Sequence, residues 1–144
     1  MLERKRKILV LILVLTAVVG ILAKPYLFNS KKDLNTTSTP IEAYQKALVD
    51  GKPIFLEFYG ELCPACVRME PVVMELEEKY KDKIAFIIVD VNDPESRKLI
   101  EEYRVFSIPY FIYIDSNGEI AGYDVGSNSL EYMEEKIQIY LLTD

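Results

Sequence analysis

Two cysteines carry the chemistry that this sequence suggests most directly. Cys63 and Cys66 are the only cysteines among 144 residues, and there is no histidine. A thiol attacks as a thiolate, and the unpaired amide groups at the start of a helix favour that anion. An apolar run before the cysteines and a helical pattern after them place Cys63 where a helix begins. Cys66 then lies one turn further on, so the spacing predicts Cys63 as the attacking thiol and Cys66 as the resolving thiol.

Two other uses of the cysteine pair compete with this interpretation. A pair with this spacing can be half of a zinc site, but the missing ligands would have to come from a second chain, and we expect no metal. An inert disulfide closing so small a loop would add little stability through chain entropy. The lack of histidine also excludes hydrolases that use a serine and a histidine.

Charge is distributed unevenly along the chain. Residues 1–40 carry seven of the 17 basic and two of the 23 acidic side chains, which leaves ten basic and 21 acidic side chains, a net charge near −11, for the rest. A field of that sign repels phosphate backbones. We therefore expect no nucleic-acid partner.

The N-terminus has the layout of a membrane-targeting segment. A basic cluster, Arg4 to Lys7, precedes an aliphatic run from Ile8 to Ala23, and such a run would span roughly 24 Å as a helix, slightly less than a ~30 Å bilayer core. Residues 1–28 are predicted to be a membrane anchor or signal segment, 29–38 a flexible tether and 39–144 the folded domain. The positive-inside rule predicts a single-pass protein with a cytoplasmic N-terminus and an extracytoplasmic domain, or a secreted domain if the segment is cleaved.

The rest of the sequence alternates between helical and strand patterns. Predicted helices cover Pro40 to Val49, the stretch from the cysteines to Tyr80, Pro94 to Tyr103, and Ser127 to Leu142; predicted strands cover Ile54 to Tyr59, Ile84 to Val91, Tyr110 to Ile114, and Glu119 to Asp124. Thr39 is the expected N-cap of the first helix, and Ser127, Asn128 or Ser129 that of the last. This order predicts an α/β fold with a mixed central sheet of about four strands flanked by helices.

The segment from Phe58 to Cys66 resembles the active-site segment of the thioredoxin family. The resemblance includes Pro71, which falls five residues after the second cysteine and should kink the helix, the tripeptide Ser107-Ile108-Pro109, the turn Asn117-Gly118, and Gly126. It covers about residues 39–144. It implies a thioredoxin-like fold that lacks the family's first strand.

The resemblance also implies roles for individual residues. Ile108 and a cis Pro109 would present backbone to an extended substrate beside Cys63, although an ordinary trans turn is the alternative. Glu57 would be a buried acid that handles the proton of Cys66, although it could instead face solvent. Four further residues would form the substrate-contact surface: Tyr59, Leu62, Pro64 and Ala65.

Departures from the family pattern bear on the direction of electron flow. Pro64 and Ala65 stand between the cysteines where strongly oxidising relatives have a histidine, which would stabilise the thiolate. Glu57, Glu61 and Glu70 should oppose thiolate formation. Ile88 and Val89 occupy the region where the family has a lysine, so proton handling is expected to differ.

Together these features predict an extracytoplasmic thiol-disulfide oxidoreductase that reduces or exchanges disulfides of exported proteins. Its expected partners are protein disulfides and a membrane-borne thiol or electron donor, because the sequence has no spare cysteine and no cofactor motif. We expect a monomer without a bound cofactor. Two alternatives remain: an oxidase that donates disulfides to exported proteins, and a non-catalytic tethered binding module or chaperone that uses the apolar surface around Tyr59, Leu62, Ile108 and Tyr110.

Overall fold

A computed structural model describes residues 36–143 and four positions nearer the N-terminus, Arg4, Arg6, Val14 and Leu15, which are helical. The chain divides into two units, residues 1–33 and 34–144. Apart from those four positions, the predicted anchor lies outside the described residues, as does most of the predicted tether. No helix within the described part of the chain has the length and apolar character needed to cross a bilayer.

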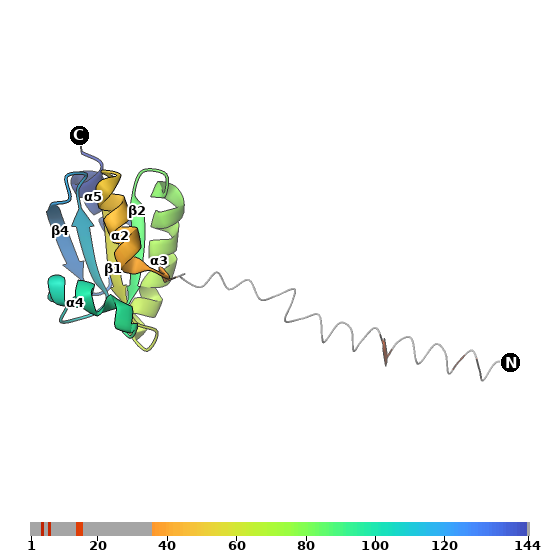
Figure 1. The fold of residues 1–144 in the computed structure, drawn as a ribbon. Helices are drawn as coiled ribbons and strands as arrows, with labels where there is room; N and C mark the ends of the chain where they lie inside the picture. Colours follow the sequence, from red (N-terminus) through yellow and green to blue (C-terminus); the bar gives the residue numbers. More distant parts are fainter. Residues whose placement is uncertain (1–3, 5, 7–13, 16–35, 144) are drawn as a thin grey trace. The chain divides into compact units, whose positions relative to one another are not determined.

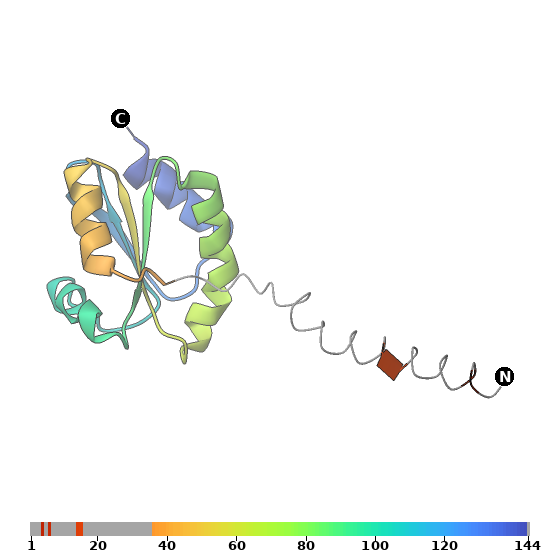
Figure 2. The same cartoon turned by 45° about the vertical axis from the view of Figure 1, so that its right-hand side comes forward.

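The second unit is a four-stranded sheet between two layers of helices. Its helices are α2 (Pro40–Val49), α3 (Pro64–Tyr80), the short 3-10 helix η1 (Pro94–Ser96), α4 (Arg97–Glu102) and α5 (Leu130–Leu141); its strands are β1 (Ile54–Tyr59), β2 (Ala85–Asp90), β3 (Tyr110–Ile114) and β4 (Ile120–Val125). The strand order is β2-β1-β3-β4, with β1 parallel to β2 and the other pairs antiparallel. Figure 2 shows α2 and α4 on one face of the sheet and α3 and α5 on the other.

All six residues of β1 are buried because the strand lies between β2 and β3 and is covered on both faces. Alternate side chains enter different cores. Phe55 packs with residues of α3 and α5, whereas Leu56 packs with residues of α2 and α4. Burial on both faces explains the near-continuous apolar sequence of this strand. The cysteine loop begins at the end of β1, so the buried strand positions the start of that loop (Figure 1).

The predicted elements are all present, with shifted ends. The helix expected from Pro94 to Tyr103 is split into η1 and α4, and the last helix begins at Leu130 rather than Ser127. Thr39 holds the N-cap position of α2, but its side chain makes no capping hydrogen bond. Thr37, assigned from sequence to the tether, bonds to β2: its amide donates to the Ile88 carbonyl at 2.8 Å, and its hydroxyl accepts from the Ile88 amide at 3.0 Å.

Ser129 is the N-cap of α5, since its side-chain oxygen accepts a hydrogen bond from the Tyr132 amide at 3.2 Å. Replacing it with alanine leaves that amide without its partner, so we expect Ser129→Ala to lower the free energy of unfolding by about 1 kcal/mol. Ser127→Ala, two residues earlier and outside the helix, is the matched control. Urea unfolding of both variants measures the change, and an equal loss of unfolding free energy in Ser127→Ala would contradict the assignment of Ser129 as the N-cap.

Candidate active site

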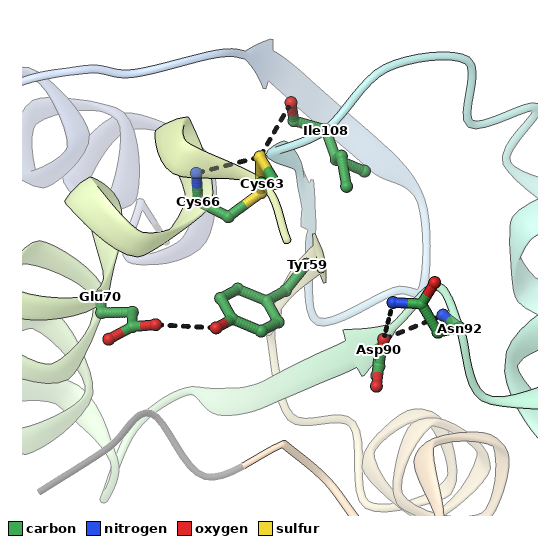
Figure 3. Close-up of a disulfide and its surroundings, with 7 residues drawn as sticks. All are labelled: Tyr59, Cys63, Cys66, Glu70, Asp90, Asn92 and Ile108. Carbon is green, nitrogen blue, oxygen red and sulfur yellow. Dashed lines mark hydrogen bonds between the residues drawn. A yellow bond between two sulfur atoms is a disulfide. The ribbon is translucent and has the colours of Figure 1, made fainter. Parts of the chain in front are cut away.

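Cys63 and Cys66 form a disulfide at the start of α3, with their Cα atoms 5.2 Å apart (Figure 3). Cys63 is the N-cap residue of the helix, and its Sγ accepts a hydrogen bond from the Cys66 amide at 3.1 Å. Pro64 follows at the first helical position, where the missing N–H of proline costs no helical hydrogen bond. The local sequence thus places one sulfur within hydrogen-bond distance of a backbone amide at a helix N-terminus.

The two sulfurs differ in access to solvent. Cys63 is half-buried, whereas Cys66 has no exposed surface. The amide that bonds to Cys63 Sγ and the partial positive charge of the helix start both favour a thiolate at Cys63 over one at Cys66. An incoming disulfide can therefore reach Cys63 first, and Cys66 can act only afterwards, by attacking the Cys63 sulfur of the mixed disulfide.

The loop before β3 lies against the cysteines. The Ile108–Pro109 peptide bond is cis, as the resemblance implied, and the Ile108 carbonyl oxygen lies 3.7 Å from Cys63 Sγ. Gly60 packs closely against the same loop, since a Cβ there would lie 2.9 Å from the end of the Ile108 side chain. Pro109 is buried and its carbonyl accepts from the Gly126 amide at 2.9 Å. Backbone of two segments, the start of α3 and the loop before β3, thus meets at the attacking sulfur.

The predicted contact residues do not all lie at the surface. Leu62 is 95% exposed beside Cys63, Pro64 is exposed and Ala65 is half-buried. Tyr59, by contrast, is only 6% exposed. Tyr59 therefore packs in the core that includes Cys66 and does not line the surface that a substrate would meet.

Glu57 is completely buried and neither of its carboxylate oxygens has a hydrogen-bond partner within residues 36–143. It shares a sheet face with Phe55 and Tyr59, the face that packs against Cys66. Burial first, and the negative charge of Glu70 second, raise the pKa of Glu57 from 4.5 to about 8. The solvent-facing alternative is therefore wrong, and the carboxyl is mostly protonated at neutral pH. Its β2 neighbour in register is Ile88, which supplies no compensating charge.

Glu70 and Tyr59 form a second polar pair behind the cysteines, which the sequence analysis did not identify. The Tyr59 hydroxyl donates to the Glu70 carboxylate at 2.7 Å (Figure 3). Burial, followed by this hydrogen bond, raises the pKa of Tyr59 and keeps it a donor. The signal in the sequence was the position of Glu70, one helical turn after Cys66. The pair holds a negative charge close enough to act on Glu57.

Glu70→Gln tests this coupling. The glutamine oxygen can still accept from Tyr59, so the change removes charge and keeps the hydrogen bond. We expect the pKa of Glu57 to fall below 8 but to stay above 4.5, because burial, the larger cause, is unchanged. Carbon-13 NMR titration of the Glu57 carboxyl measures it. Glu61→Gln, which removes an exposed charge from the neighbouring loop, is the control, and an unchanged or higher pKa in Glu70→Gln would count against the coupling.

No metal centre is evident in the part of the chain that the structure describes, where no three His, Cys, Asp or Glu side chains gather as potential ligands. The site is instead a redox-active cysteine pair with a buried acid. Such a site can transfer two electrons as two thiols interconvert with one disulfide.

Comparisons with known proteins agree with this chemistry. The thioredoxin family model matches residues 35–139. The thioredoxin-like protein HCF164, chloroplastic, of Arabidopsis thaliana is 34% identical over 108 residues, which cover 75% of this chain and 40% of that protein. The thiol:disulfide interchange protein TxlA homolog of Synechocystis is 32% identical over 91 residues, 63% of this chain and 51% of the relative. The chain thus spans two fifths to one half of the length of these relatives.

Solved structures support the fold. The germline-specific thioredoxin Deadhead of Drosophila melanogaster superposes with a TM-score of 0.62 at 25% identity, covering 73% of this chain and 97% of that one. Mitochondrial thioredoxin 3 of Saccharomyces cerevisiae gives a TM-score of 0.61 at 24% identity, covering 72% and 93%. With the matched family model, the related interchange proteins and the cysteine pair at a helix start, this chain belongs to the thioredoxin family.

Proposed function

We propose that the protein reduces or exchanges disulfides of exported proteins on the outer side of a cytoplasmic membrane. The observation that carries this proposal is the asymmetry of the two sulfurs: Cys63 is accessible and bonded to an amide at the helix start, whereas Cys66 is buried behind it. That arrangement suits a substrate that arrives as a protein disulfide, because one sulfur receives it and the other releases it.

The proposed reaction consists of two exchanges. The Cys63 thiolate attacks one sulfur of the substrate disulfide, and the other substrate sulfur leaves as a thiolate. Cys66 then loses its proton and attacks Cys63, which breaks the mixed disulfide and releases the second substrate sulfur. Two electrons pass to the substrate, which gains two thiols, and the protein ends in the disulfide form.

Glu57 is the proposed acceptor of the Cys66 proton. It lies on the sheet face that packs against Cys66. With a pKa of about 8, roughly a tenth of the Glu57 carboxyls are ionised at pH 7 and can accept a proton, and the protonated majority can return one. The reverse transfer would serve when a thiol donor reduces the Cys63–Cys66 disulfide, since the departing Cys66 sulfur then needs a proton.

The proposed location rests on the basic cluster and apolar run at the N-terminus. A membrane-impermeant maleimide applied to reduced spheroplasts that express the full chain tests it. Labelling of Cys63 in intact spheroplasts is the expected result, and labelling only after lysis would refute the location. In an oxidising compartment, a reductant also needs a thiol donor, which we propose is membrane-borne.

The direction of transfer is testable by equilibrating the full chain with glutathione buffers. No histidine lies between the cysteines, and three glutamates are near them, which disfavours a strongly oxidising pair. We expect a reduction potential well below about −230 mV, whereas a value near −120 mV would identify a disulfide donor instead.

A further inference from the structure

An exposed aromatic patch lies next to the active-site loop. Phe106, in the loop between α4 and β3, is 81% exposed, and Tyr123 and Val125 on β4 are 64% and 40% exposed. Tyr110 lies among them and is largely buried. Its ring centroid is 6.1 Å from that of Phe106 and 5.9 Å from that of Tyr123. We call Phe106, Tyr110, Tyr123 and Val125 the aromatic patch.

The sheet topology explains why Tyr123 and Val125 stay uncovered. β4 is an edge strand. Tyr110 pairs with Val125 and Ile112 pairs with Tyr123, so the side chains of these four strand residues share one face of the sheet. That is the face of α2 and α4, and α2 passes over the middle of the sheet and leaves β4 at its margin (Figure 1). Exposed aromatic side chains grouped in this way indicate an interaction site more than a folding requirement.

The patch is continuous with the backbone at the attacking sulfur. Tyr110 directly follows Pro109, and the amide of Gly126, next to Val125, donates to the Pro109 carbonyl at 2.9 Å. The Ile108 carbonyl oxygen lies 3.7 Å from Cys63 Sγ. A polypeptide joined to Cys63 therefore lies beside the loop that leads from Phe106 to Tyr110.

We propose that the aromatic patch binds an apolar, preferably aromatic, side chain of the substrate protein close to the cysteine that bonds to Cys63. This inference rests on the proposed function and specifies its substrate class. Ring-to-ring contact and the loss of exposed apolar area favour such a side chain at Phe106 and Tyr123. The acidic charge of the domain disfavours carboxylates beside it, so the preferred segment is neutral or basic.

Peptide disulfides test the preference. Each peptide carries one cysteine joined to glutathione in a glycine and serine background, with a single phenylalanine, or serine as the reference, placed at successive positions on either side of the cysteine. The reduced full chain is mixed with each peptide, and the rate of glutathione release is followed, because glutathione leaves when Cys63 bonds to the peptide sulfur. We expect phenylalanine at the favoured position to raise the rate about tenfold over serine.

The variants are Phe106→Ser and Tyr123→Ser, both at exposed positions. The control is Val49→Ser, which removes an 87% exposed side chain at the far end of the sheet from Cys63. We expect the phenylalanine-to-serine rate ratio to fall towards one in both patch variants and to keep its wild-type value in the control. Thermal unfolding verifies that each variant is folded.

The outcomes separate this inference from the proposed function. If the wild-type protein exchanges with no peptide at all, the proposed function fails. If it exchanges with all peptides equally, or keeps its preference in both patch variants, the aromatic patch is not a substrate site. A sedimenting dimer that Phe106→Ser dissociates, without any peptide preference, would show that the patch joins two copies of the chain and would overturn the inference.

Discussion

Cys63→Ser is expected to bring the reduction of insulin by dithiothreitol down to the uncatalysed rate. Cys63 is the accessible sulfur that accepts the Cys66 amide hydrogen bond, and a serine hydroxyl in its place is not ionised at neutral pH and cannot form a disulfide. The turbidity of precipitating insulin chains measures the rate. Activity equal to that of the wild-type protein in this variant would refute the assignment of the active site.

Cys66→Ser should behave differently from Cys63→Ser, so each variant is a matched control for the other. This variant retains the attacking sulfur and lacks the one that resolves the mixed disulfide, so a covalent complex with the substrate should accumulate. Non-reducing electrophoresis after a single turnover detects it. A covalent complex with Cys63→Ser and none with Cys66→Ser would make Cys66 the attacking thiol and Cys63 the resolving thiol. That result would contradict the assignment based on the complete burial of Cys66.

Glu57→Gln should raise the free energy of unfolding by roughly 3 to 5 kcal/mol at pH 9 and change it little at pH 4. The carboxyl has a pKa of about 8 in the folded protein and 4.5 as its ordinary value. Between these values the unfolded chain releases the proton while the native protein keeps it, so native stability falls as pH rises from about 4.5 to 8. Glutamine has no proton to lose and avoids this cost.

Urea unfolding of the disulfide form at several pH values measures the difference. Both oxygens of Glu57 lack hydrogen-bond partners in the described part of the chain, so the neutral amide is no worse placed than the neutral acid at low pH. Glu61→Gln removes an exposed carboxylate four residues later and should show no comparable rise at pH 9. A stability difference that does not change with pH would contradict an elevated Glu57 pKa.

Several parts of the fold could be predicted because they depend on neighbouring residues in the chain. The near-continuous apolar run of β1, the proline after Cys63 and the Asp115 to Gly118 turn each specify local backbone, and Gly118 adopts the positive φ of 81° that glycine tolerates. Element ends were less predictable. Ser127, Asn128 and Ser129 are all residue types that cap helices well, and the structure shows that Ser129 is the one that does so.

The amino-acid sequence alone determined that two thiols lie one helical turn apart at a helix start, since this needs only local backbone preferences. The tertiary structure decided what surrounds them. Glu57 has an ionisation set by complete burial, Tyr59 donates to Glu70 across 11 positions of sequence, and Tyr123 stays exposed at the edge strand β4. Burial and charge proximity arise from segments distant in the chain, so they exist only once the sheet and its two helical layers have assembled.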